Sequence, residues 1–127
     1  MRALLEGKGY AVLDVGCHGK EACDYPDFAK AVAQAVLRGD CVQGIMIDGA
    51  GIGSSMVCNR FPGIRAALCY DMKSILNSRA HNNANVLVLG AAANPPEVVD
   101  AMVLSWLGTP FEGGRHQKRV DKIERDV

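Results

Sequence analysis

The sequence lacks the charge imbalance that would direct a protein toward nucleic acid or a membrane surface. Its 14 Lys and Arg residues are balanced by 14 Asp and Glu residues, so the formal net charge is zero. Polyanion-binding proteins normally carry an excess of basic side chains. The sequence also has no apolar run of the roughly 18 residues that a membrane-spanning helix requires. We therefore expect neither nucleic acid nor membrane among its partners.

Histidine is scarce, and the cysteines do not form metal-binding pairs. The chain has three His and five Cys residues, with no Cys-x-x-Cys motif and no His at ligand spacing from two cysteines. This pattern argues against a structural zinc site. Because the Cys count is odd and no signal-peptide pattern opens the chain, we expect reduced thiols, buried as small apolar side chains, in a cytoplasmic protein. His18 is expected to be a polar loop residue.

What the sequence does contain is an alternation of strand and helix patterns. Its 127 residues, 49% hydrophobic and 22% charged, suit one soluble domain over residues 1–127. Strands are expected at 11–15, 44–47, 65–69 and 85–90, and helices are expected to end near 8, to begin at 25, 52, 71 and 95, and to cover 114–125. Several strands are short apolar runs, as expected when helices cover both faces of a sheet. The pattern predicts an α/β fold with a doubly wound, Rossmann-like parallel sheet.

The segment from Gly44 to Ser55 carries the clearest functional signal. An apolar strand ends at Asp48, and the glycine-rich turn Gly49–Gly53 then opens into a helix. The N–H groups of such a turn favour negative charge, but a carboxylate directly before it would repel a phosphate. That arrangement suits a base acting on a carbon, with the N–H groups stabilising the resulting oxyanion. The alternative interpretation is a glycine-lined packing turn.

A second polar turn, His81-Asn82, lies at a helix-to-strand junction. A His beside amide donors can move protons on a sugar hydroxyl or carbonyl, and it can equally serve as a cation at a helix C-terminus. This turn precedes a strand, whereas Asp48 follows one. The two therefore lie at opposite edges of the sheet in one subunit, and His81 can act with Asp48 only from a second subunit.

Two arginines follow the last glycine pair. Arg115 and Arg119 are four residues apart, so on a helix they share a face and can grip one phosphate together. The alternative is an ordinary solvated basic helix. Near the other end of the chain, Tyr25 with the following proline marks a helix start.

These segments, in this order, resemble the ribose-5-phosphate isomerase B family, which also includes galactose-6-phosphate isomerase subunits. The motifs that carry the resemblance are Asp24–Ala29, Gly49–Gly53, Asn59, Gly63–Ala67, Ser78–Arg79, His81–Asn82, Asn85–Leu87, Glu112–His116 and Arg119–Val120. The resemblance implies a homodimer, often paired into a tetramer, with active sites shared across the dimer and a C-terminal helix that reaches the partner. It also implies interconversion of aldose and ketose sugar phosphates without a metal or cofactor.

The resemblance also implies a role for each matching residue. The implied site residues are Asp48 and His81 for catalysis, Gly49, Ala50, Gly51, Ile52, Gly53, Asn82 and Tyr25 for the sugar, and Arg115 and Arg119 for the phosphate. The turn backbone would stabilise a cis-enediolate. His81 would assist opening of the furanose ring, and Asn82 would position the sugar.

The chain departs from the family pattern in four ways. Asp48 replaces the usual cysteine base, Ala50 replaces a threonine, and Ala92 replaces an arginine. The family's first strand, with its Asp-His pair, is absent. We expect the natural protein to begin roughly twenty residues earlier, and the alternative is a true truncation. The departures leave open an active isomerase, a homologue that binds sugar phosphate or a partner without catalysis, and an isomerase for another pentose or hexose phosphate.

Overall fold

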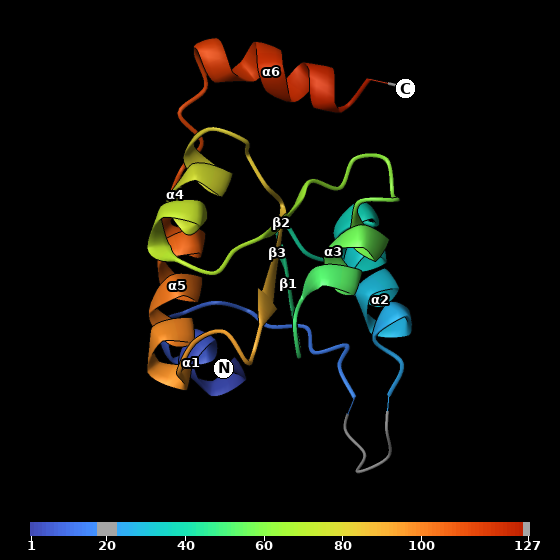
Figure 1. Ribbon diagram of the computed structural model, residues 1–127, viewed down its shortest axis with the longest axis vertical. Helices are drawn as coiled ribbons and strands as arrows, with labels where there is room; N and C mark the ends of the chain where they lie inside the picture. The colour runs from blue at the N-terminus through green and yellow to red at the C-terminus, as the bar shows by residue number, and fades with distance from the viewer. Residues whose placement is uncertain (18–22, 126–127) are drawn as a thin grey trace.

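The computed structural model describes residues 1–17 and 23–125. Within them, a sheet of three parallel strands in the order β1-β3-β2 is covered by helices on both faces (Figure 1). The elements are α1 (Arg2–Gly7), α2 (Tyr25–Leu37), β1 (Gly44–Asp48), α3 (Ile52–Cys58), β2 (Ala66–Leu68), α4 (Met72–Ala80), β3 (Val86–Gly90), α5 (Pro96–Gly108) and α6 (Arg115–Ile123). The predicted α/β class with a parallel sheet is confirmed.

Strand β3 is the centre of the molecule, and every one of its residues is buried. Its side chains alternate between two apolar clusters, because successive residues of a strand point to opposite faces. Leu87 and Leu89 join the cluster that contains Trp106 of α5. Val86 and Val88 join the cluster formed with α2 and α3. The continuous apolar run in the sequence is therefore explained by burial on both faces.

Helix starts follow the local signals in the sequence. Proline occupies the first turn of both α2 and α5, where a missing N–H costs nothing. Asp71 caps α4 in a capping box with Ser74. Hydrogen bonds from the Ser74 backbone and side chain lower the pKa of the Asp71 carboxyl. The predicted helices at 25, 52, 71, 95 and 114–125 are all present.

The predicted strand at 11–15 is wrong. These residues form no strand, and among the described residues β1 pairs only with β3, which leaves the other edge of β1 free. A cavity of about 610 Å³ lies between this edge, α2 and the segment 10–16. The N–H and C=O groups of a strand need partners on a neighbouring strand. In the described chain, no strand lies between this segment and β1 to provide them. Apolar side chains stay exposed around the edge: Leu13, Val42 and Ile47.

The cysteines fulfil the prediction only in part. Cys58 and Cys69 are buried free thiols, and burial raises the pKa of Cys58 to about 11. Cys17 and Cys23 instead form a disulfide, so the expectation of five reduced thiols is wrong for this pair. Their Cα atoms are 6.6 Å apart, within the usual reach of the bond.

His18 lies outside the described residues. No helix in the described ranges is both long and apolar enough to cross a membrane.

The two faces of α4 allow a matched test of the core. Ile75 is fully buried, whereas its neighbour Leu76 is 44% exposed. Ile75→Ala should lower the free energy of unfolding by about 3 kcal/mol because it leaves a cavity in the cluster around Trp106. Leu76→Ala should change it by less than about 1 kcal/mol. Urea denaturation followed by circular dichroism measures both, and equal losses would contradict the packing.

Candidate active site

Asp48 is the last residue of β1, and its two carboxylate oxygens are hydrogen-bonded to the glycine turn and to the first turn of α3. One oxygen accepts the backbone N–H of Gly51, and the other accepts the hydroxyl of Ser54. Asp48 is half-buried, and Ser54 is fully buried beneath it. The sequence pattern does not identify Ser54 as a partner of Asp48, although its position in the first turn of α3 is a common one for a side-chain hydrogen bond. The carboxylate is therefore held in one orientation.

The turn itself is clamped to the end of β3. The carbonyls of Asp48 and Gly49 accept the N–H groups of Ala91 and Ala92 at 2.7 and 3.2 Å. Gly51 has a φ of 81°, in the left-handed region that favours glycine. The first N–H groups of α3 follow directly, where a helix leaves its amides without intrahelical acceptors. The result is a rigid turn that presents N–H donors beside a carboxylate.

Tyr25, at the start of α2, lies against the same turn. A Cβ atom placed on Gly53 would collide with the Tyr25 hydroxyl group and ring. The Tyr25 side chain is nonetheless 45% exposed, so its hydroxyl borders both the turn and solvent. Tyr25, Asp48 and the residues Gly49–Gly53 are therefore brought together, an arrangement that agrees with the grouping implied by the family resemblance.

At the other end of the sheet, His81 is the C-cap of α4, and its ring stacks on His116. The ring centroids are 4.1 Å apart and the ring planes differ by 13°. One carboxylate oxygen of Glu112 lies 3.7 Å from Nε2 of His81 and 3.4 Å from Nε2 of His116. The sequence pattern assigns no role to Glu112 or His116, although their spacing of four residues is a signal that they meet.

Asn77 fixes the orientation of the His81-Asn82 turn. Its amide nitrogen lies 3.1 Å from Nδ1 of His81, and its Oδ1 accepts the Asn82 amide at 2.8 Å. When Asn77 donates to Nδ1, the ring proton of neutral His81 is on Nε2, facing Glu112. Asn77 lies one helical turn before His81, which is the only sequence signal for this role.

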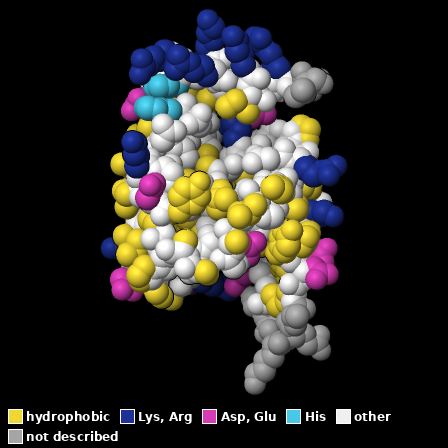
Figure 2. Space-filling model, viewed as in Figure 1, with side chains coloured by type: hydrophobic (Ala, Val, Ile, Leu, Met, Phe, Trp, Pro, Cys, Tyr) yellow, Lys and Arg dark blue, Asp and Glu magenta, His cyan; other side chains and the backbone are white. Residues whose placement is uncertain are grey.

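Arg115 and Arg119 lie on α6 and are exposed. Among the described residues, neither has an ion pair. Lys and Arg side chains line α6 in Figure 2, with His side chains directly beneath that row. The helix thus offers unpaired positive charge to an anion on the outside of the molecule.

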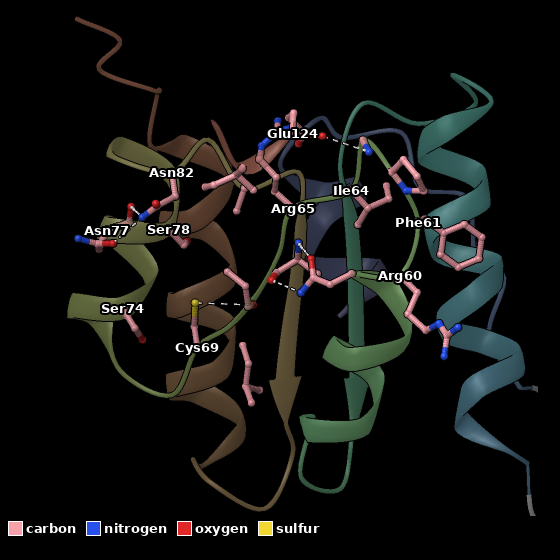
Figure 3. Close-up of a pocket in the computed structure, with 18 of the residues that line it drawn as sticks. Arg60, Phe61, Ile64, Arg65, Cys69, Ser74, Asn77, Ser78, Asn82 and Glu124 are labelled. Atoms are coloured by element: carbon pink, nitrogen blue, oxygen red, sulfur yellow. Dashed lines mark hydrogen bonds and ion pairs between the residues drawn. The ribbon is translucent and has the colours of Figure 1, made fainter. Parts of the chain in front are cut away.

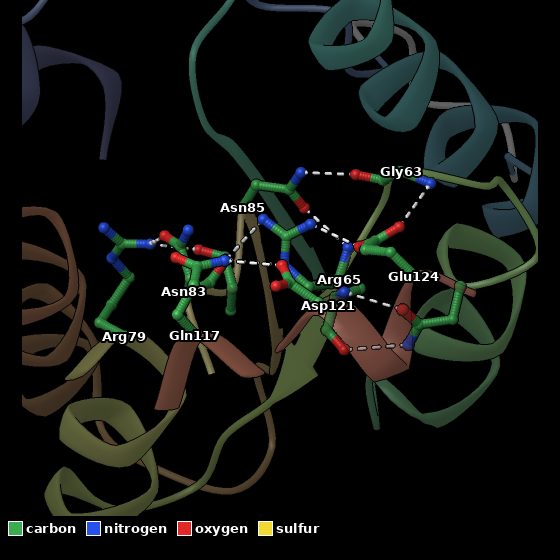
Figure 4. Close-up of polar contacts among 11 residues, drawn as sticks. Gly63, Arg65, Arg79, Asn83, Asn85, Gln117, Asp121 and Glu124 are labelled. Atoms are coloured by element: carbon green, nitrogen blue, oxygen red, sulfur yellow. Dashed lines mark hydrogen bonds and ion pairs between the residues drawn. The ribbon is translucent and has the colours of Figure 1, made fainter. Parts of the chain in front are cut away.

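A polar network attaches α6 and the His81 turn to the sheet (Figure 4). Arg65 beside β2 binds both the Glu124 carboxylate and the Asn83 carbonyl. Arg79 donates to the Asn83 side chain at 2.9 Å and to the Thr109 carbonyl at 3.1 Å. Burial lowers the pKa of Arg79, and the charge of Arg65 lowers it further. The network fixes the start of β3 relative to the chain that leads into α6.

The two groups of candidate residues lie at opposite ends of the sheet (Figure 1). Asp48 pairs in register with Gly90 at the end of β3, whereas His81 precedes the start of β3. At about 3.3 Å per residue, the intervening strand alone spans on the order of 13 Å. One subunit therefore does not bring Asp48 and His81 together, as the order of the elements predicts.

A cavity of about 970 Å³ opens beside β2, between α3 and α4 (Figure 3). Its lining includes Arg60, Phe61, Cys69, Ser78 and Asn82. Of the predicted site residues only Asn82 borders it. The cavity is thus separate from the Asp48 group and touches the His81-Asn82 group only through Asn82.

Comparisons with known proteins agree on one family. Residues 1–123 match the family model described as Ribose/Galactose Isomerase. Ribose-5-phosphate isomerase B of Escherichia coli is 44% identical over 121 residues, covering 95% of this chain and 81% of that protein. D-erythrulose-4-phosphate isomerase of Pectobacterium atrosepticum is 40% identical over 120 residues, covering 94% and 79%. The solved ribose-5-phosphate isomerase B of Clostridium thermocellum superposes with a TM-score of 0.94 at 46% identity, covering 97% of this chain and 83% of that one.

The geometry of the turn predicts different costs for two neighbouring glycines. A Cβ on Gly51 would lie 2.6 Å from Cδ1 of Leu68, in a backbone conformation that L side chains rarely adopt, whereas a Cβ on Gly49 meets nothing within 4 Å. Gly51→Ala should lower the free energy of unfolding by about 2 kcal/mol. Gly49→Ala should stay within about 0.5 kcal/mol of the parent. Urea denaturation of the pair checks this, and an unaffected Gly51→Ala variant would refute the strained turn.

Proposed function

The chain belongs to the ribose/galactose isomerase family, and from that premise we propose that Asp48 and the glycine turn convert an aldose phosphate into its ketose phosphate. Its activity class is that of a sugar-phosphate isomerase of the ribose-5-phosphate isomerase B type. The observation that carries the residue assignment is the Asp48 carboxylate, held half-buried at the mouth of a clamped turn.

In the proposed reaction, the Asp48 carboxylate removes the proton from C2 of the open-chain aldose. The electron pair of that C–H bond forms the C1–C2 double bond of a cis-enediolate, and the carbonyl electrons move onto the oxygen. N–H groups of the turn stabilise that oxygen because they are already oriented toward the developing charge. A proton then moves from the C2 hydroxyl to the C1 oxygen, and return of the proton from Asp48 to C1 lets the electrons on the C2 oxygen form the carbonyl of the ketose. A carboxylate suits this transfer because one positioned group can take the proton from C2 and return it to C1.

The hydrogen bonds to Asp48 also favour a second candidate function. Both oxygens are engaged, by Gly51 and Ser54, so the carboxylate has a structural task as the cap of its own turn. A homologue that binds sugar phosphate without turning it over would keep that task and lose the chemistry. In the isomerase, the Ser54 hydroxyl holds one oxygen in place while the other receives the proton.

The residues at the far end of the sheet supply the rest of the proposed site. Nε2 of His81 donates a proton to the ring oxygen as the furanose opens, and Glu112 stabilises its charged form. Asn82 positions the sugar hydroxyls from this end of the sheet, and Tyr25 does so from the Asp48 end. Arg115 and Arg119, exposed and unpaired within the described chain, bind the phosphate as a pair.

A homodimer is part of the proposal because the two groups of residues lie at opposite ends of one subunit. A two-fold axis that sets the Asp48 end of one subunit against the α6 end of its partner completes two equal sites. α6 lies across the end of the sheet, with its basic face free to reach a partner (Figures 1 and 2). Pairing of dimers into a tetramer is compatible with this arrangement.

The proposed substrate is ribose 5-phosphate or a sugar phosphate of similar size. The two named relatives act on a five-carbon and a four-carbon sugar phosphate, by their names, at similar identity to this chain. Ala50 and Ala92 remove side-chain contacts that the family pattern would provide, which is compatible with a change of sugar. Turnover assays over tetrose, pentose and hexose phosphates, each with its unphosphorylated sugar as control, identify the preferred substrate.

Asp48→Asn tests the base. The amide keeps the size of the side chain but does not accept a proton, so exchange of the C2 proton with solvent deuterium should fall by about 10²–10⁴-fold. Proton NMR of the sugar in deuterated buffer measures the exchange. Isothermal titration with the same sugar phosphate should still show binding. Full exchange in the variant would exclude Asp48 as the base, and binding without turnover in the parent protein would favour the second candidate.

Mixing two inactive variants tests the shared site. Asp48→Asn is combined with a variant that lacks both Arg115 and Arg119 side chains, and the two are refolded together in equal amounts. Half of the dimers are then mixed, and each has one intact site of two, so about a quarter of the parent activity should return. A variant with alanine at Lys118 and Lys122, on the same helix, is the control for lost charge and should stay active. No recovery in the mixture would mean that each subunit holds its own site.

A further inference from the structure

The proposed isomerase chemistry uses His81 and Glu112 but gives no role to His116, whose ring stacks on that of His81 and shares the Glu112 carboxylate. We propose that His81, Glu112 and His116 form a binding site for a divalent transition-metal ion of the zinc class, and that the ion acts as an inhibitor. Two imidazole nitrogens and one carboxylate oxygen are the ligands that such ions bind when a fourth position is left to water. Their ligand atoms all lie within 4.8 Å of one another.

The distances in the cluster fit one ion. With metal–ligand bonds of about 2.0–2.1 Å, neighbouring ligand atoms of a tetrahedral site lie about 3.3 Å apart. The Glu112 oxygen lies 3.4 Å from Nε2 of His116 and 3.7 Å from Nε2 of His81. Two of the three ligand separations are therefore close to those that the ion needs. The third separation, between the ring nitrogens of the two histidines, shortens when the rings turn out of their parallel stack and both nitrogens face a common point.

The surroundings determine which ligands are fixed and which adapt. The His116 side chain is 8% exposed and lies within the first turn of α6, so its position is set by the fold. The Glu112 side chain is 58% exposed and can swing toward the ion. Asn77 lies 3.1 Å from Nδ1 of His81, and half a turn of its amide presents Oδ1 to an Nδ1–H. Metal-bound histidines commonly donate their second ring nitrogen to such a carbonyl oxygen.

The charges near the proposed site act in opposite directions, because α6 also carries Arg115 and Arg119. Glu112 contributes one negative charge, which offsets part of the charge of the ion. The ligands come from two segments, the end of α4 and the approach to α6, that are attached to each other through Arg79 and Thr109. The ion would therefore bind a preassembled pair of segments without ordering a loop.

The consequence for activity rests on the proposed function. A metal ion on Nε2 of His81 removes the proton donor for ring opening, so bound metal should inhibit the isomerase. Metal binding itself is independent of that assignment, because it is measured without substrate. Metal binding and inhibition by metal are therefore measured separately, and either one can be refuted without the other.

Binding is tested by titrating the metal-free full-length protein with Co²⁺, which reports its ligands through visible absorption. One equivalent should produce the intense bands of a four-coordinate nitrogen and oxygen site, and Zn²⁺ should displace them. Glu112→Gln and His116→Ala should each weaken binding by about 100-fold or more. Each removes a direct ligand, and loss of a residue that only hydrogen-bonds to a ligand already costs about 10–100-fold. Asn77→Ala should weaken it by about 10-fold. Glu97→Gln, an exposed acid on α5, is the matched control and should bind as the parent does.

Three outcomes would overturn the proposal. Weak octahedral bands in the parent would show that the ion keeps its water shell. A near-ultraviolet sulfur-to-cobalt band would assign the ion to the free thiols. Unchanged binding by Glu112→Gln, whose exposed side chain does not affect folding, would exclude the cluster. If the intense four-coordinate bands appear and Zn²⁺ leaves the turnover of ribose 5-phosphate unchanged, the metal site stands and the inhibitory role of the ion is refuted.

Discussion

The burial of β3 on both faces and along both edges is the constraint on which the rest of the structure depends. Its residues fill two apolar clusters at once, and its backbone binds β1 on one side and β2 on the other. At its end, Gly90 leaves no room for a Cβ, because the Ala50 carbonyl oxygen would lie 2.6 Å away. At its start, Asn85 holds the Gly63 carbonyl and the Arg65 amide. One strand therefore fixes both the glycine turn and the polar turn.

That arrangement determines how the proposed chemistry is divided. The end with Asp48 offers a carboxylate and backbone donors, which suit proton removal from carbon and stabilisation of an oxyanion. The end with His81, Arg115 and Arg119 offers proton donors and positive charge, which suit ring opening and phosphate binding. A rigid strand keeps the ends apart, so the proposed chemistry requires a second subunit and not movement within the first. Affinity for the phosphate and power of the base are then separable properties of different surfaces.

Much of the fold follows from local patterns in the sequence, and the exceptions have physical causes. Proline and Asp71 mark helix starts because caps act within one turn, and the apolar run of β3 indicates burial on both faces. The segment 11–15 has the residues of a strand, but the described part of the chain places no strand beside it to pair with. Asp48, His81 and the paired arginines are selected as candidates from residue type and order, and their roles stay predictions. The contacts of Ser54, Asn77 and His116 are not identifiable in this way, because each depends on how a turn closes or how two distant segments meet.

The contact between Tyr25 and Gly53 constrains how this site can evolve. The aromatic ring occupies the space that any side chain at position 53 would need, so a substitution there displaces the tyrosine from the turn. A smaller residue at position 25 would remove the conflict and at the same time the hydroxyl beside the proposed sugar site. The two positions are therefore epistatic: the order in which they mutate determines whether the lineage passes through an impaired intermediate. A family member with a side chain at position 53 is expected to have changed position 25 first.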